Sequence, residues 1–250
     1  RAAVSEWEAM GVVARWEAAS ASLEDPALVG VPGMNAPIRA MAEPLGVDWS
    51  VRAERLYREG ANWRIESDCG VYAAPLVVLA IPAEQAAALL AQAAPQLAAI
   101  PAQVVSQPCW AVMASFAEPL GIFVDTVRAD NDAIAWAARN SAKPGRSGPE
   151  SWVIHASPAR SRELLECAKD EIGLTLLTDF AKQTGLDFPE PLHLSAHRWL
   201  YALPAALPGE PWRYDAAAGI GLAGDYLHSP RVEGAWLSGK ALAREILRTG

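Results

Sequence analysis

The spacing of apolar residues along the chain changes several times, and each spacing predicts a different element. Residues 13–17 alternate between apolar and polar, which favours a short strand. A helix is expected to start at Asn35, with Pro37 in its first turn, and to end at Gly46. The apolar residues of this helix fall on one face: Met34, Ile38, Met41 and Leu45.

Residues 49–74 favour two alternating strands joined at Gly60–Asn62, with a third strand after Gly70. The run PLVVLAIP at 75–82 is apolar throughout, which is typical of a buried strand in a parallel pair. An alanine-rich helix follows it and is expected to break at Pro95.

The middle of the chain changes character, because strand candidates lie close together there without long helices between them. This arrangement predicts an antiparallel sheet from residues 108–116, 121–127, 133–140, 151–157 and 192–203. One long helical region is expected from Ser157 and Pro158 to Gly185. Near the C-terminus, a strand of small residues is predicted to lead into Asp225, and a helix is predicted from Ala235.

Composition narrows the possible partners. The 250 residues are 52% hydrophobic and carry a net charge of -8, so the chain has material for a large core and no basic surface for nucleic acid or anionic lipid. No apolar run approaches the roughly 20 residues of a membrane span, and RAAVSEWEAM does not resemble a signal peptide. A small-molecule partner is therefore expected, with the oligomeric state left open.

Cysteine and histidine give no metal or disulfide pattern. The three cysteines are far apart, and with the cysteines interpreted as core residues, a reducing cytoplasm is the simplest localisation. His193 and His197 are four residues apart, but in a strand this spacing separates them too far to share a small ion. No metal site is predicted.

The order G-x-G-x-x-G occurs at Gly219, Gly221 and Gly224, as in a dinucleotide-binding loop. Such a loop needs a helix directly after it and, about 20 positions further on, an acidic residue at the end of a second strand. Here a loop with a proline follows, and after it only a single helix is expected. The match is therefore interpreted as accidental, and the segment as a strand that another backbone or a flat ring can approach closely. Asp225 at its end could accept hydrogen bonds from hydroxyls, and the helix after Gly234 directs backbone N–H groups to the same place. These features suit the ribityl chain and carbonyl edge of a flavin.

The segment GLAGDYLHSPRVEGAWLSGKALAREIL resembles the C-terminal flavin segment of the FAD-dependent amine oxidase family, and more narrowly its renalase-like branch. Four other segments agree with that branch: VGVPGMNAPIRAMAEPL, VVLAIPAEQAAALL, WAARNSAKPGR followed by SWVIHASPARSRELLE, and HRWLYALP. The resemblance covers nearly the whole chain.

The resemblance implies roles for individual residues around FAD. Asp225 would bind the ribityl hydroxyls beside Gly224, and Ala53 would hold the adenine through its backbone. The residues after Gly234 would lie against the flavin ring, with backbone N–H groups facing its C2 carbonyl: Ala235, Trp236 and Leu237. A strand would end near the cofactor at Ala80 and Pro82, and the helix from Asn35 would run beside the flavin.

The chain departs from the family at its start. The family carries its glycine fingerprint and acidic ribose ligand in the first several dozen residues, and this sequence has neither. The expectation is an N-terminal truncation, a separate chain that supplies the missing unit, or a preceding segment outside this sequence. Each places tight FAD binding by these residues alone in question.

The substrate side is expected around ARNSAKPGR and HRW. The first segment concentrates Arg139, Asn140, Ser141, Lys143 and Arg146. It favours either a polar hairpin tip or a cationic patch that holds an anion such as a nucleotide phosphate. His197 and Trp199 share one face of a strand, and they would border the flavin or pack in a core. Arg139, Asn140, His197 and Trp199 are the expected catalytic-site residues.

The expected fold is α/β, with an FAD-binding half at 28–84 and 206–250 that lacks its N-terminal unit. It is interwoven with a substrate half of antiparallel sheet plus helices at 1–27 and 85–205. The expected function is renalase-like oxidation of isomeric dihydronicotinamide nucleotides with O₂ as acceptor. Two alternatives are an oxidase of small amines and a non-catalytic structural or interaction module.

Overall fold

The computed structural model describes residues 2–20 and 26–249. Their contacts divide the chain into two compact units, of which unit 1 comprises the residues up to Val47 and Pro108–Trp199. Unit 2 comprises Asp48–Gln107 and the residues from Leu200 onward. Compared with the division expected from the sequence, residues 28–47 fall in unit 1, and residues 85–107 and 200–205 fall in unit 2. The assignment of one half to the flavin and the other to the substrate stays a prediction.

Unit 1 is built on a five-stranded sheet with the strand order β11-β7-β10-β9-β8. The antiparallel pairing expected from the sequence is confirmed for β7 with β10, β10 with β9 and β9 with β8. The expected strand at 121–127 is wrong over most of its length, because only its last two residues belong to β8. The bounds are β7 Ser106–Phe116, β8 Thr126–Arg128, β9 Ile134–Arg139, β10 Glu150–Ala156 and β11 His193–Pro204.

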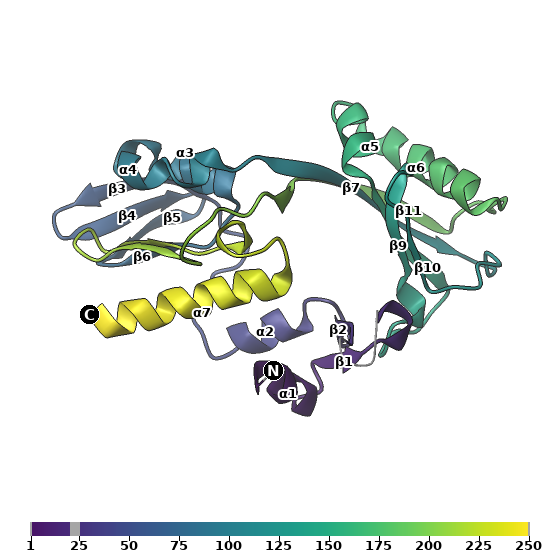
Figure 1. Cartoon of the computed structure of the whole chain (residues 1–250), viewed down its shortest axis with the longest axis horizontal. Helices are drawn as coiled ribbons and strands as arrows, with labels where there is room; N and C mark the ends of the chain where they lie inside the picture. The colour runs from purple at the N-terminus through teal and green to yellow at the C-terminus, as the bar shows by residue number, and fades with distance from the viewer. Residues whose placement is uncertain (1, 21–25, 250) are drawn as a thin grey trace. The chain divides into compact units, whose positions relative to one another are not determined.

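One face of this sheet, which we call the helix face, is covered by α5 (Pro158–Glu163) and α6 (Lys169–Thr184) (Figure 1). Trp152 on β10 and Val112 on β7 are buried there against Ile172 and Phe180 of α6. Because successive side chains of a strand point to opposite sides, the residues between them project from the other face, which we call the second face.

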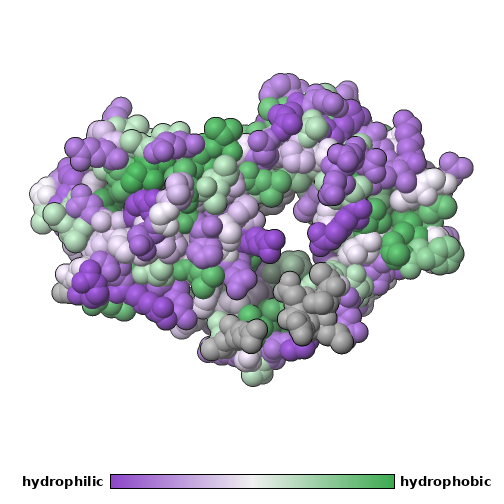
Figure 2. Space-filling view, viewed as in Figure 1, coloured by the Kyte–Doolittle hydropathy of each residue, from purple (hydrophilic) through white to green (hydrophobic). Residues whose placement is uncertain are grey.

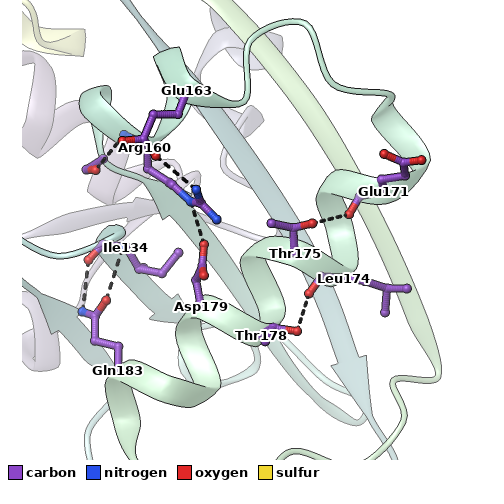
Figure 3. Close-up of polar contacts among 10 residues, drawn as sticks. Ile134, Arg160, Glu163, Glu171, Leu174, Thr175, Thr178, Asp179 and Gln183 are labelled. Carbon is purple, nitrogen blue, oxygen red and sulfur yellow. Dashed lines mark hydrogen bonds and ion pairs between the residues drawn. The ribbon is translucent and has the colours of Figure 1, made fainter.

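Polar contacts attach these helices, as Figure 3 shows. Arg160 on α5 forms an ion pair with Asp179 on α6, with Nε and Oδ2 2.9 Å apart. Gln183 on α6 exchanges hydrogen bonds with the backbone of Ile134 on β9. The single long helix expected here is interrupted between Glu163 and Lys169, whereas its two ends are as predicted: Ser157 caps α5 and Gly185 ends α6 at φ 70°.

The second face is partly covered by a two-stranded sheet of β1 (Val13–Arg15) and β2 (Leu28–Gly30), with the 3-10 helix η1 (Glu17–Ala19). Trp16 and Val29 pack there with Ala138 and Trp136 of β9. Unit 1 also contains α1 (Ala2–Ala9) and α2 (Ala36–Ala42), so α2 ends before the predicted Gly46. Three residues of the predicted apolar face of α2 are exposed: Met34, Ile38 and Leu45. In Figure 2, such apolar patches interrupt a largely hydrophilic surface.

Unit 2 contains a three-stranded sheet, β12-β13-β6, with β12 Arg213–Asp215, β13 Ile220–Leu222 and β6 Val77–Leu79. The pairing of β6 with β13 is parallel, which confirms the prediction made from PLVVLAIP. The predicted meander of three strands is also present: β3 Ala53–Glu59, β4 Asn62–Ser67 and β5 Gly70–Ala74.

The sheet of unit 2 is covered on both faces. Ile220 and Leu222 of β13 pack with Trp63 of the meander and Leu90 of α3 (Ala83–Ala93) in one core. Between them, Gly221 faces α7 (Val232–Thr249), where a Cβ would lie 3.1 Å from a methyl carbon of Leu242. The helix α7 runs along one side of this unit (Figure 1), and the predicted break at Pro95 is confirmed, since α4 (Pro95–Ala98) begins there.

The cysteines differ from the expectation, because Cys109 is buried whereas Cys69 and Cys167 are exposed; all three are free thiols. Within the described part of the chain, no helix has the length and apolar composition to cross a membrane.

Candidate functional site

Four of the predicted cofactor residues meet at the carboxyl edge of β6 and β13. The two strands run parallel, so both end at this edge, and Ala223 N–H donates to Leu79 O at 3.1 Å directly after them. Ala80 and Pro82 follow β6, and Gly224 and Asp225 follow β13. Ligands of open α/β sheets bind outside the carboxyl ends of the strands, so the position suits a cofactor.

Asp225 is half-buried at this edge. Its Oδ1 accepts a hydrogen bond from Tyr226 N–H at 2.9 Å, and a carboxylate keeps further acceptor sites beyond one such bond. Burial raises the pKa of Asp225, and the nearby charge of Glu84 raises it further, although backbone hydrogen bonds act in the opposite direction. Glu84 itself has a fully buried Oε2 without a hydrogen-bond partner. The structure therefore places a poorly solvated carboxylate where hydroxyl donors would stabilise it.

The helix α7 begins at Val232, and not at Ala235 as predicted. Ala235 N–H already donates to Arg231 O at 3.1 Å, so the backbone donors without a partner inside the helix are those of residues 232–234. Gly234 was interpreted as a boundary, but it lies inside the first turn of α7, where a Cβ would be 2.2 Å from Ser229 O. The contacts expected between the flavin ring and Ala235, Trp236 and Leu237 stay a prediction.

Contacts of small residues hold this helix start against the strand end. Gly224 N–H donates to Ser238 Oγ of α7 at 2.9 Å, and Ser238 is completely buried. A Cβ on Gly224 would lie 2.5 Å from the Tyr226 ring, so this position needs glycine for space. The strand end, one carboxylate and a helix N-terminus converge here, which fits the ribityl chain and carbonyl edge of FAD. Ala53 lies elsewhere in unit 2, exposed at the start of β3, and its contact with adenine stays a prediction.

Two of the expected catalytic-site residues lie on the second face of the unit 1 sheet. Ala196 of β11 is in the core of the helix face, so His197 and Trp199 do not share its side. Their rings are 4.4 Å apart between centroids, and Trp199 is 56% exposed. His197 also lines a cavity of about 510 Å³ with five other residues: Trp110, Glu166, Cys167, Lys169 and Arg198.

Arg139 lies on the helix face, opposite to His197. Its partner across the strands is Trp152, and its guanidinium carbon lies 5.1 Å from that ring. Arg139 forms an ion pair with Asp125 at 2.7 Å and a longer one with Glu150 at 3.6 Å, and it also donates to Ile122 O. A guanidinium with these partners has little capacity left for a substrate anion. Asn140, the first residue of the 3-10 helix η3 (Asn140–Ala142), accepts from Lys143 N–H through its backbone oxygen.

One second-face residue, His155, was not among those predicted from the sequence, whereas Lys143 was predicted as part of the possible cationic patch at 139–146. Lys143 is only 7% exposed, and its Nζ lies 5.5 Å from the Trp16 ring centroid and 6.0 Å from that of Trp136. His155 on β10 stacks on Trp136 with the ring centroids 4.9 Å apart. Alternation places His155 opposite the buried Ile154, but the approach of Trp16 to Lys143 depends on contacts across more than a hundred residues of sequence.

No group of three or more metal-binding side chains occurs among residues 2–20 and 26–249, and no metal was predicted.

The chain belongs to the family of flavin-containing amine oxidoreductases, whose family model matches residues 14–247. The family is flavin-containing, so the FAD cofactor expected from the sequence is confirmed, as is the mixed α/β fold of a flavin-binding protein.

Solved structures share this fold at low sequence identity. A candidate protoporphyrinogen oxidase from Exiguobacterium sp. 255-15 has a TM-score of 0.67 and 20% identity over 88% of this chain and 52% of its own. Cyclohexylamine oxidase from Brevibacterium oxydans IH-35A has a TM-score of 0.61 and 14% identity, over 86% of this chain and 52% of its own. Putrescine oxidase bound to putrescine has a TM-score of 0.59 and 17% identity, over 90% of this chain and 54% of its own. The chain thus spans about half the length of these proteins. The renalase-like branch, the N-terminal truncation and the cytoplasmic localisation stay predictions.

Proposed function

We propose that the protein is an FAD-dependent oxidoreductase of the renalase-like type, which oxidises isomeric dihydronicotinamide nucleotides and passes the electrons to O₂. The observation that carries this proposal is the chemistry of the second face of the unit 1 sheet. Across all five strands, each fully described, Glu150 is the one acidic residue, and it lies with Arg139 on the helix face. The second face combines aromatic rings with the ammonium of Lys143.

This combination suits a flat substrate that carries an anion. Aromatic side chains stack on a nicotinamide ring, whereas a protonated amine is attracted by carboxylates or by an uncharged aromatic cage. A buried ammonium repels a second cation nearby, so Lys143 works against an amine substrate.

The roles of the chain's own residues follow from this assignment. When bound, FAD supplies the hydride acceptor. In unit 2, Asp225 and the start of α7 would hold FAD by its hydroxyls and carbonyl edge. In unit 1, the aromatic residues of the second face would stack on the substrate ring. A dedicated acid–base pair is not required for such a transfer.

The decisive experiment compares substrates on the purified, FAD-loaded protein. We expect O₂ consumption with 2- or 6-dihydronicotinamide mononucleotide and none with putrescine or cyclohexylamine. Turnover of an amine and not of a dihydronicotinamide would refute the proposal. The ordinary 4-dihydro isomer is the matched control, because it differs only in the position of the added hydrogen.

An amine oxidase is the second candidate. Membership in the family of flavin-containing amine oxidoreductases favours it. A non-catalytic module is the third candidate. Protein that stays colourless after reconstitution with FAD would favour the module over both enzymes.

A further inference from the structure

The turn that carries Lys143 is fixed by tight packing. Arg146 N–H donates to Lys143 O at 3.2 Å, which closes a turn with Pro144 and Gly145 in its centre. Gly145 has φ +72°, and a Cβ there would lie 2.6 Å from Cγ1 of Val31. Arg146 also donates from Nη2 to Gly30 O at 3.0 Å. The backbone of this lysine is therefore held against the loop after β2.

The side chain of Lys143 points into an aromatic cage and not toward a carboxylate. The indoles of Trp16 and Trp136 flank the ammonium, and His155 stacks on the second of them. Within the described part of the chain, no Asp or Glu forms an ion pair with Lys143 or Arg146, whereas Arg139 has two such partners. Burial lowers the pKa of Lys143, and the charge of Arg146 lowers it further.

Lys143 is more than nine-tenths buried, with its ammonium near the two indoles. A buried cation without a counter-charge is costly, and a bound anion would remove that cost.

We propose that Lys143, with His155 beside it, binds the anionic group of the substrate, a phosphate or a carboxylate, and that Arg139 does not. His155 assists as a neutral donor. Burial and then the charge of Lys143 lower its pKa, so at neutral pH the ring carries one N–H and no positive charge. This inference rests on the proposed function only in taking the ligand to be the substrate.

Calorimetric titration of the FAD-loaded protein with two probes tests the site. The probes are oxidised nicotinamide mononucleotide and nicotinamide riboside, which differ by one phosphate. In Lys143→Met we expect the affinity for the mononucleotide to fall about tenfold or more, as for loss of a charged hydrogen bond, and the affinity for the riboside to be retained. The control is Lys182→Met, the same change at an exposed lysine of α6, with both affinities unchanged. Equal loss of both affinities, or loss of neither, would overturn the proposal.

Inorganic pyrophosphate separates this site from the reaction. If the protein fails to oxidise dihydronicotinamides but binds pyrophosphate in a Lys143-dependent way, the anion site stands and the reaction assignment is wrong. Should Lys143→Met not fold, the wild-type protein still decides the question by NMR. On titration with phosphate, the ring signals of His155 should move and those of the exposed His193 should not; an unmoved His155 overturns the site.

Discussion

On the helix face of the five-stranded sheet, Arg139 lies against Asp125, Glu150 and Trp152, whereas on the second face Lys143 lies between two indole rings. The two residues are four positions apart in one segment, and both are basic. Their surroundings differ because Arg139 belongs to β9 and lies on the helix face, while Lys143 follows a 3-10 helix and turns to the opposite side. A cation with its counter-charges in place is explained by folding alone, whereas for Lys143, which forms no ion pair with a described Asp or Glu, we propose a ligand.

The largest effect on stability is expected when Arg139 is changed. Arg139→Met leaves two partly buried carboxylates without their cation, so the free energy of unfolding should fall by about 2–4 kcal/mol. Urea denaturation measures this change, and Arg128→Met, at an exposed arginine of β8 in the same sheet, is the control, with about 0.5 kcal/mol or less expected. If Arg139→Met loses phosphate binding but keeps its stability, the roles we give to Arg139 and Lys143 are reversed.

Asp225 extends the comparison to unit 2, since it too is an incompletely solvated charge. An acid whose pKa is raised by folding adds stability at low pH and loses it as the pH rises through the unfolded value of 3.8 to the folded one. At neutral pH the Asp225 carboxylate is ionised in the folded apoprotein, so the full free-energy cost of its partial burial lowers the stability. Asp225→Asn should leave the apoprotein as stable or more stable, while the affinity for FAD falls about tenfold or more.

Thermal unfolding of the apoprotein and titration with FAD check the two parts of this prediction. Glu210→Gln, at an exposed carboxylate of the same unit, is the matched control and should change neither quantity. An apoprotein that is destabilised with unchanged FAD affinity would mean that Asp225 serves the fold and not the cofactor.

The smallest effect is expected at His155. Its lowered folded pKa means that the unfolded chain binds the proton more readily, so the free energy of unfolding should decrease as the pH falls below about 6.5. Lys143→Met removes a positive charge next to the ring, so the pKa of His155 should rise and this acid-induced loss should become smaller. NMR titration of the four histidines gives the pKa, and urea denaturation at about pH 7.5 and about pH 5.5 gives the stability. An unchanged His155 pKa would show that the two groups are not electrostatically coupled.

Local patterns were sufficient to predict most elements. The strand candidates at 133–140, 151–157 and 192–203 correspond to β9, β10 and β11, and the apolar run predicted β6 as a strand of a parallel pair. The start of α7 was predicted three residues too late, because a glycine is typical of a helix boundary. Here Gly234 lies inside the helix, where its missing side chain avoids a clash with Ser229. Ser229 is only five residues before Gly234, but the spacing of residue types does not show how closely the two residues pack.

The residues of the candidate site also differ in how well the local sequence predicts them. Gly224 and Asp225 act through backbone and position, and their segment contains most of what arranges them. Arg139 could not be distinguished from Lys143, because the carboxylates that pair with Arg139 lie 11 and 14 residues away on other elements. The register of β9 and β10 also shifts between His155 and Ala156, and this shift changes which face a strand residue occupies. No residue type at these positions predicts the shift.

The packing of Gly145 against Val31 has a consequence for the kinetics of recognition. A free lysine side chain gives up about 1.5–2 kcal/mol of rotamer entropy when it is immobilised. Because the turn and the two indoles hold Lys143 before any ligand arrives, that loss has already occurred during folding. An anion should therefore meet a preorganised receptor, and its association should need no slow rearrangement of the chain around the ammonium.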